Sequence, residues 1–311
     1  MNDLKIFAPA SNLNEIEFQL NEGADELYIG LIDSVWAKKY HRYAAAVISP
    51  NRREGLSYNF SAWDELEKAV NIVHKANKSI SFALNAHCYS NETLDDLRLI
   101  VDNVYNLNFD YLIIEDPFLL DYFIMDGVNK TKINLSGDTM VLNSQSAKWF
   151  QKKGVSRITF PQNITLKEIE IIARQNPMIE FEVFMLNGKC IFNSGTCFCM
   201  HGFRFIDGNV LPPLCANIAA VRDCNSQWFQ KRIQGITCGV CAIPFLRNID
   251  NIKSLKIVGR DITSSSKMSL TKFMKMILST ASDSYQEIYC QYFGTNKSDC
   301  QNKINCIYHE V

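Results

Sequence analysis

The sequence predicts an α/β fold, a closed (β/α)8 barrel of the TIM type with a cysteine-rich insertion between strands seven and eight. Eight short β-like runs alternate with helix-like segments, and this alternation favours a parallel sheet with crossover helices. Eight such units in 311 residues fit a closed barrel better than the alternative, an open doubly wound sheet. In addition, seven of the eleven cysteines fall between residues 190 and 241, after the seventh run and before the eighth.

The elements follow from hydrophobic periodicity and from helix-start signals. The expected strands are 4–8, 26–29, 79–86, 111–114, 132–136, 156–160, 179–185 and 254–258. The expected helices are 12–23, 61–77, 93–106, 117–124, 144–154, 165–175 and 269–280. Leu66, Ala69, Val70 and Val73 share one face of the second helix, and Pro117 suits a first helical turn. The polar and aromatic stretch 30–60 is expected to be a long loop.

Composition and charge restrict the function classes. We expect a barrel domain over residues 1–280, with the cysteine-rich loop at 187–250, and a cysteine-containing tail over 281–311. The net charge of −1 provides no general attraction for RNA or an anionic membrane. There is no apolar run of membrane-spanning length and no pattern typical of a secretion signal. These features predict a cytoplasmic protein, in which structural disulfides are rare.

The cysteines are expected at the C-terminal rim of the barrel, where active sites of this fold lie. Only 238-CGVC-241 has the clean spacing of a zinc pair, and Cys197 and Cys199 are too close together for one. The irregular spacing favours an iron–sulfur cluster over zinc, with ordinary buried thiols as the third reading. The tail cysteines Cys290, Cys300 and Cys306 indicate either a second metal site or a folded-back tail.

Other catalytic signatures are missing from the sequence. It has no His-Glu-x-x-His helix, no Gly-x-Ser-x-Gly elbow, no Walker loop and no Gly-x-Gly-x-x-Gly. The five histidines are scattered, and His87 alone follows an expected strand at the rim. A Cys–His nucleophilic pair is an alternative, but no spacing of cysteine and histidine in the sequence indicates one.

The segment that follows strand seven resembles the collagenase-like peptidase family of unassigned catalytic type, number U-thirty-two. Glu182-Val183-Phe184 is followed by CIFNSGTC at 190–197, as in the family's pattern. Similar matches occur at 8–13 (APASNL), 23–30 (GADELYIG), 113–117 (IIEDP), Ser136, Val141, Asn143 and 256–260 (KIVGR). The resemblance implies a barrel with a 4Fe-4S cluster on four cysteines. It also implies either oxygen-independent hydroxylation, with prephenate as hydroxyl donor and ubiquinone or RNA as substrate, or the older peptidase activity.

Position by position, the resemblance places the cluster on Cys190, Cys197, Cys215 and Cys241, with Cys238 competing for the fourth place. The sequence also departs from the family's pattern. Leu186-Asn187 replaces a His-Gly pair, Val258 replaces an acidic residue in strand eight, and Gly137-Asp138 replaces a Thr-Gln pair. These departures put the familiar substrate in doubt, and with it the donor.

Residues at the ends of the strands form the expected substrate pocket. They are Asn85, Asp116, Lys256 and Arg260, because strand ends at a barrel rim aim side chains at one cavity. Arg260 would bind a carboxylate or, equally, pair with an acid of the barrel wall. The preferred function is a hydroxylase-type iron–sulfur enzyme acting on a small molecule or short peptide, with RNA and membrane disfavoured. The alternatives are a peptidase and a non-catalytic cluster-bearing subunit that forms a heterodimer with a related chain.

Overall fold

A computed structural model of the chain describes residues 3–40, 49–51, 53, 56–86, 89–124, 131–188, 204–206, 209–211 and 235–311. Three of the expected cluster ligands, Cys190, Cys197 and Cys215, lie outside these ranges, as does His87. Asn85, Asp116, Lys256, Arg260 and Cys241 lie within them.

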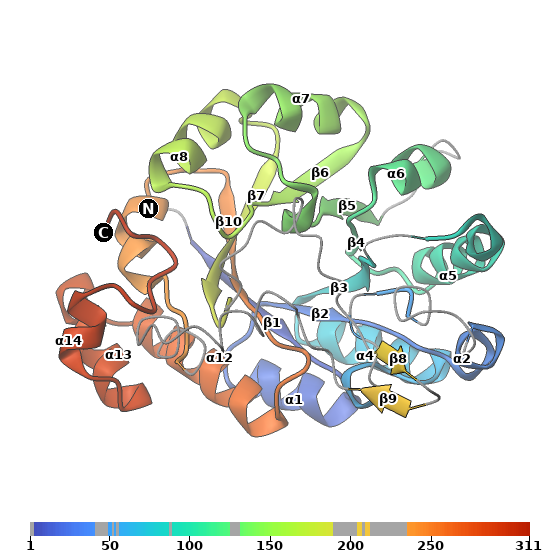
Figure 1. The fold of residues 1–311 in the computed structure, drawn as a ribbon, viewed down its shortest axis with the longest axis horizontal. Helices are drawn as coiled ribbons and strands as arrows, with labels where there is room; N and C mark the ends of the chain where they lie inside the picture. Colours follow the sequence, from blue (N-terminus) through green and yellow to red (C-terminus); the bar gives the residue numbers. More distant parts are fainter. Residues whose placement is uncertain are drawn as a thin grey trace.

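Eight parallel strands close into a barrel in the order β1-β10-β7-β6-β5-β4-β3-β2, which confirms the predicted fold class (Figure 1). The strands are β1 (Lys5–Pro9), β2 (Glu26–Ile29), β3 (Ser79–Leu84), β4 (Tyr111–Ile114), β5 (Lys132–Leu135), β6 (Val155–Thr159), β7 (Glu180–Leu186) and β10 (Ile252–Ile257). Every neighbouring pair is parallel, including the closing pair of β1 and β10, in which Phe7 lies opposite Lys256. The expected strand boundaries are matched to within two residues.

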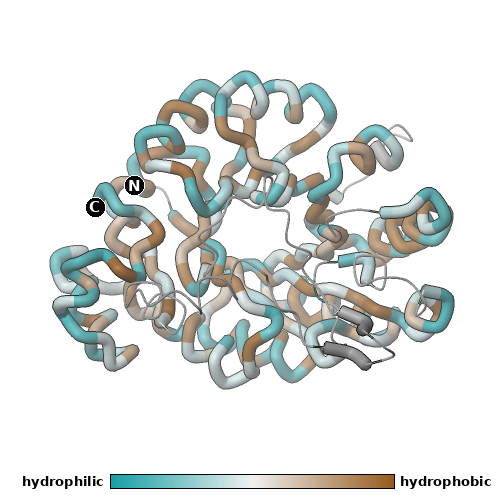
Figure 2. Tube along the Cα trace, viewed as in Figure 1, coloured by the Kyte–Doolittle hydropathy of each residue, from teal (hydrophilic) through white to brown (hydrophobic). Residues whose placement is uncertain are grey.

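Helices between the strands, and one after β10, cover the outside of the barrel (Figure 1). They are α1 (Leu13–Asn21), α2 (Ser34–Tyr40), α4 (Trp63–Lys75), α5 (Leu94–Asn106), α6 (Pro117–Ile124), α7 (Ser144–Lys152), α8 (Leu166–Gln175) and α12 (Ser264–Leu278). The helix faces that pack on the barrel are mostly apolar, and the faces that point outward are mostly polar (Figure 2). In α4 the four residues predicted to share one face are all buried. No helix among the described residues is long and apolar enough to cross a membrane.

Helix α2 corrects the expectation of a loop throughout 30–60. Asp33 accepts a hydrogen bond from the backbone N–H of Trp36 at 2.7 Å, which satisfies an otherwise unpaired donor in the first turn. One turn later Tyr40 is also buried, and the two rings lie 4.5 Å apart. The burial of Trp36 and Tyr40 and the contact between their rings therefore stabilise a short helix that has no long periodic pattern.

The cysteine-rich insertion and the tail add structure outside the barrel. Within the insertion, β8 (Arg204–Ile206) pairs antiparallel with β9 (Asn209–Leu211). The insertion ends in a short helix, α11 (Ile243–Leu246), before β10. After α12 the tail forms α13 (Tyr285–Phe293) and α14 (Lys297–Gln301), which lie beside the barrel (Figure 1). Phe273 of α12 and Phe293 of α13 attach the tail, with ring centroids 4.8 Å apart.

Candidate functional site

A layer of charged side chains fills the barrel interior toward the N-terminal ends of the strands. Arg157 of β6 donates two hydrogen bonds to Glu26 of β2, at 2.7 and 3.1 Å. Ser254 of β10 also donates to Glu26. The side chains of Arg157 and Glu26 are each 1% exposed, so the pair is screened from solvent. Such a bidentate pair fixes the separation of two strands on different sides of the barrel.

Two further groups complete this layer. Arg157 binds Glu180 of β7 at 2.8 Å, and its guanidinium lies 4.1 Å from the ring centre of Tyr111 on β4. Burial works against the charged form of Arg157, but Glu26 outweighs it and holds the Arg157 pKa above its ordinary value. Burial alone would raise the pKa of Glu180, but Arg157 and the Tyr111 hydroxyl hold it below its usual range. Arg157 and Glu180 are therefore both charged at neutral pH, and we refer to this layer as the floor of the barrel.

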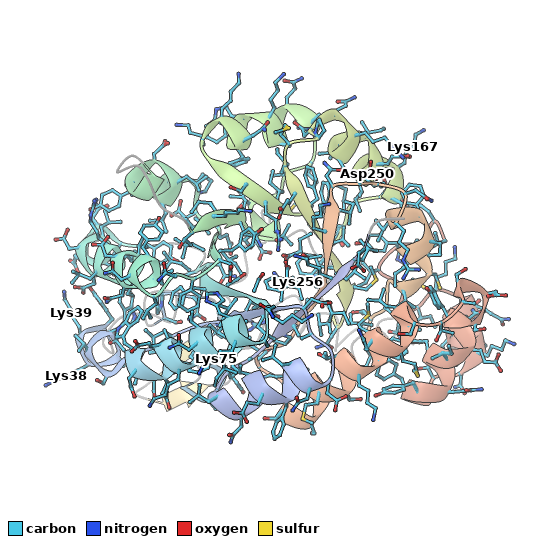
Figure 3. The ribbon with its side chains drawn as sticks, turned by 180° about the vertical axis from the view of Figure 1, so that it is seen from behind. Lys38, Lys39, Lys75, Lys167, Asp250 and Lys256 are labelled. Carbon is cyan, nitrogen blue, oxygen red and sulfur yellow. The ribbon has the colours of Figure 1, made fainter. Side chains whose placement is uncertain are left out.

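Lys256 and Glu182 form a second ion pair above the floor, one pleat closer to the strands' C-terminal ends. The Lys256 Nζ lies 2.7 Å from Glu182 Oε1, and the Glu182 side chain is fully buried. Thr159 and Asn134 also donate to Glu182, at 2.9 and 3.1 Å. The Lys256 side chain remains 12% exposed, which makes it the accessible member of the pair. Figure 3 shows Lys256 near the middle of the barrel, whereas Lys38, Lys39 and Lys167 lie on the outside.

Aromatic faces surround the Lys256 ammonium. Its Nζ lies 4.8 Å from the ring centres of Phe7 and Tyr28 and 5.9 Å from that of Phe184. Such distances give favourable cation–π contacts. Lysine carries three N–H donors, and within the described part of the chain Glu182 is its one hydrogen-bond acceptor. Two donors therefore remain for an anionic or carbonyl group of a ligand.

Arg260, expected either to bind a carboxylate or to pair with an acid of the barrel wall, is held by amides. It is 4% exposed and donates to Asn51 Oδ1 at 2.7 Å and to Asn59 Oδ1 at 3.3 Å. A Cβ at Gly30 would overlap its guanidinium, so glycine is required for this close approach. This geometry favours a structural role, with amides where the sequence analysis had expected an acid.

The other two expected pocket residues differ from each other. Asp116 follows β4 as predicted, but its Oδ1 accepts from the backbone N–H of Phe118 at 2.9 Å, so it caps α6. Asn85 follows β3 and is partly buried, and its enclosed Oδ1 has no hydrogen-bond partner among the described residues. Asn85 therefore remains a candidate contact for a ligand, whereas Asp116 stabilises a helix start.

Four of the five cysteines that the structure describes gather in one place. Cys238, Cys241, Cys300 and Cys306 line one pocket at the junction of the insertion and the tail. Burial raises the pKa of the Cys238 thiol well above its ordinary value, and Cys241, Cys306 and Cys300 act in the same direction. The one expected cluster ligand that the structure describes, Cys241, thus lies among tail thiols.

Apart from Lys256, the interior charges were not predicted from the sequence, although a signal for them exists. Glu180 and Glu182 alternate with apolar residues along β7, as Ser254 and Lys256 do along β10. In a barrel these alternate positions point inward. Charged residues at two successive inward positions would have indicated an ionic interior.

The family follows from a direct comparison. The model of Peptidase family U32 matches residues 11–309, nearly the whole chain. This chain belongs to Peptidase family U32. The match includes the tail with Cys300 and Cys306, as well as the barrel.

Relatives within the family carry two kinds of name. The tRNA hydroxylation protein P of Helicobacter pylori is 26% identical over 63% of this chain and 42% of its own length. Its Escherichia coli counterpart is 24% identical over 62% of this chain and 38% of its own length. The chain therefore spans about two fifths of these relatives. An uncharacterized protease of Methanocaldococcus jannaschii is 23% identical over 98% of this chain and 72% of its own length.

A solved structure of a U32 peptidase is similar over 60% of this chain and 70% of its own, with 16% identity and a TM-score of 0.43. This overlap is too loose to add to the barrel topology, which the strand pairing establishes by itself.

Proposed function

We propose that this chain is an iron–sulfur enzyme of the oxygen-independent hydroxylase type that acts on a small anionic molecule or a short peptide at the barrel mouth. The observation that carries the proposal is the accessible Lys256 ammonium, which lies in an aromatic cage with two donors left for a ligand. Membership of a family whose named members include tRNA hydroxylation proteins supports the reaction class.

The cluster is part of this proposal. Cys190, Cys197 and Cys215 would supply thiolates from the segment that follows β7, with a fourth from the 238-CGVC-241 pair or from another cysteine of the insertion. When bound, such a cluster would supply one-electron chemistry. Of these donors the structure describes Cys238 and Cys241, and it groups both with the tail cysteines. Support for the cluster therefore comes mainly from the three cysteines identified in the sequence, Cys190, Cys197 and Cys215.

The residues of the cage have separate roles in this proposal. Lys256 would bind a carboxylate of the substrate or of the donor, for which prephenate, a dicarboxylate, is our candidate. Glu182 would hold the ammonium in position. Phe7, Tyr28 and Phe184 would exclude water from the side facing the barrel interior.

The substrate class differs from that in the relatives' name. With a net charge of −1, this chain provides little general attraction for phosphates. We therefore favour a small molecule or a short peptide over tRNA.

A peptidase is the second candidate, because the relative with the fullest overlap on this chain among those described above carries a protease name. Metal removal separates the two readings. Iron chelation under reducing conditions should abolish a cluster-dependent hydroxylase and leave a peptidase without metal dependence unchanged. A non-catalytic subunit paired with a related chain would show neither activity until that partner is added.

Binding of prephenate to Lys256 variants tests the role of the cage. Lys256→Met should weaken binding by about ten- to a hundredfold, because a charged hydrogen bond contributes about 1.5–3 kcal/mol. Lys256→Arg should retain most of the affinity. Lys253→Met is the matched control, since Lys253 lies on the same strand and binds the backbone carbonyl of Asp250 outside the cage. Isothermal titration calorimetry measures the affinities, and equal affinities in both methionine variants would refute this role.

A further inference from the structure

Two cysteines of the tail, Cys290 of α13 and Cys300 of α14, bring their thiols into contact. The side chain of Cys300 hydrogen-bonds that of Cys290, although the two belong to different helices. Both are free thiols, half-buried, and both pack against the hydrophobic core. Two thiols in contact need only side-chain rotation to reach the geometry of a disulfide. This pair is therefore placed to form one.

The backbone of the turn between α13 and α14 holds the two cysteines in place. Gly294 ends α13 with a φ of +62°, a left-handed conformation that suits glycine, and its N–H donates to the carbonyl of Cys290. The Thr295 N–H donates to the same carbonyl at 3.0 Å. The Cys300 N–H donates to Asn296 O at 3.3 Å, in the first turn of α14. Hydrogen bonds thus fix the backbone at both cysteines.

The helix that carries Cys290 is attached to the rest of the protein on either side of this residue. Tyr289 donates to the carbonyl of Ile236 at the end of the insertion, and Tyr292 donates to the carbonyl of Ser269 on α12. Cys300 of α14, in turn, lines the pocket between the insertion and the tail. A bond between the two cysteines would therefore tie α14 to a helix that is already fastened to the barrel.

We propose that Cys290 and Cys300 are a site of reversible oxidation, at which a low-molecular-weight disulfide converts the two thiols into an intramolecular disulfide. One thiolate attacks the small disulfide, forms a mixed disulfide and releases one small thiol. The second protein thiol then attacks the mixed disulfide and releases the other small thiol. The two cysteines lose two electrons and two protons in total, and the small disulfide gains them as two thiols. Neither cysteine belongs to the set assigned to the cluster, which keeps its ligands.

The surroundings of Cys290 predict a slow reaction. Burial raises the pKa of the Cys290 thiol, and the Cys300 thiol acts in the same direction, whereas Lys297 opposes them. Cys290 must lose its proton in one of the two steps, whichever thiol attacks first. Because the thiolate is the attacking species, a raised pKa lowers the fraction that reacts at neutral pH. Disulfide formation should accelerate as pH is raised from about 7 to about 9.

Peptide mass spectrometry after anaerobic incubation with oxidised glutathione tests the proposal. Trypsin separates the three tail cysteines, which fall in peptides 276–297, 298–303 and 304–311. After free thiols are alkylated, we expect peptide 276–297 to be joined to peptide 298–303. Dithiothreitol should separate the two. The iron content should be the same before and after oxidation, so the result does not depend on the fate of the cluster.

Variants and thermal unfolding provide a second readout. Cys290→Ser and Cys300→Ser should each abolish the link. Cys306→Ser is the matched control and should keep it, because Cys306 lies in the same tail and lines the same pocket as Cys300. The link closes a loop of about 11 residues, so oxidation should raise the Tm of the wild type by about 4 °C and leave that of Cys290→Ser unchanged.

Three results in the wild type would overturn the proposal. The first is a link from peptide 298–303 to peptide 304–311 or to the peptide that contains Cys241. The second is a protein that carries mixed disulfides with glutathione alone. The third is a pair of tail thiols that stays open to alkylation throughout. An unchanged Tm in protein whose disulfide has formed would show that the bond does not tie α14 to the barrel.

Discussion

Replacement of Arg157 by methionine tests whether the ionic floor holds the barrel together. Methionine keeps an unbranched apolar stem but ends short of the guanidinium, so the change removes the charge and the hydrogen bonds to Glu26, Glu180 and Tyr111. Glu26, at 1% exposed, would remain in the interior with the Ser254 hydroxyl and the more distant Lys5 as partners.

The magnitude follows from the burial of the pair. Removing one partner of a buried ion pair costs about 3–5 kcal/mol, and the remaining partners of Glu26 favour the lower end of that range. A loss of about 3 kcal/mol should lower Tm by about 5 °C in a domain of this size. The exposed pair on α8 provides a matched control, since Arg174→Met removes a similar contact to Glu170 at the surface. That change should cost less than about 1 kcal/mol.

The pH dependence supplies a second readout. Arg157 and the Tyr111 hydroxyl hold the Glu180 pKa below its usual range, so this group stabilises the wild type above its unfolded pKa of about 4.3. That contribution is lost as pH falls through the lowered folded pKa. Because the variant lacks it, the difference in Tm between wild type and Arg157→Met should narrow below about pH 4.

Calorimetric scans of both variants across pH measure these effects. A loss no larger than that of Arg174→Met, or a difference that widens on acidification, would refute the role assigned to the floor. The double variant Arg157→Met/Glu26→Met should recover part of the stability, because no buried charge is left without a partner.

Two further variants test single contacts. Arg260→Ala should lower the free energy of unfolding by about 2 kcal/mol, because the enclosed amides of Asn51 and Asn59 lose a charged donor. If the variant is stable but its affinity for prephenate falls tenfold or more, Arg260 binds the substrate instead of stabilising the fold. Thr165→Ala should cost about 1 kcal/mol in thermal unfolding, since Thr165 and Glu168 form the capping box that starts α8. An unchanged Tm would show that packing alone determines this helix start.

The fold could be predicted because short-range sequence patterns determine its helices and strands. Alternation of short apolar runs and amphipathic helices is visible within windows of a dozen residues, and the expected boundaries of β2, β4 and α6 agree with the structure. Helix α2 was missed because Trp36 and Tyr40 supply a single turn of pattern, and their burial depends on tertiary contacts.

The site was predictable only in part. Lys256 was expected among the residues at the strand ends, and it lies within β10, where its partner Glu182 on β7 is a neighbour that the sequence does not specify. The pairing of Arg157 with Glu26 joins residues 131 positions apart. The pocket shared by Cys238 and Cys306 arises in the same way, through a tail that folds back on the insertion.

The most direct test of the central claim is metal analysis combined with visible spectroscopy on the anaerobically purified protein. If the chain binds an iron–sulfur cluster, we expect a brown protein that contains iron and acid-labile sulfide and has the visible absorption of such a cluster. Replacement of Cys190 or Cys197 by alanine should remove that absorption. A colourless wild-type protein prepared without oxygen, with zinc but no iron, would contradict it.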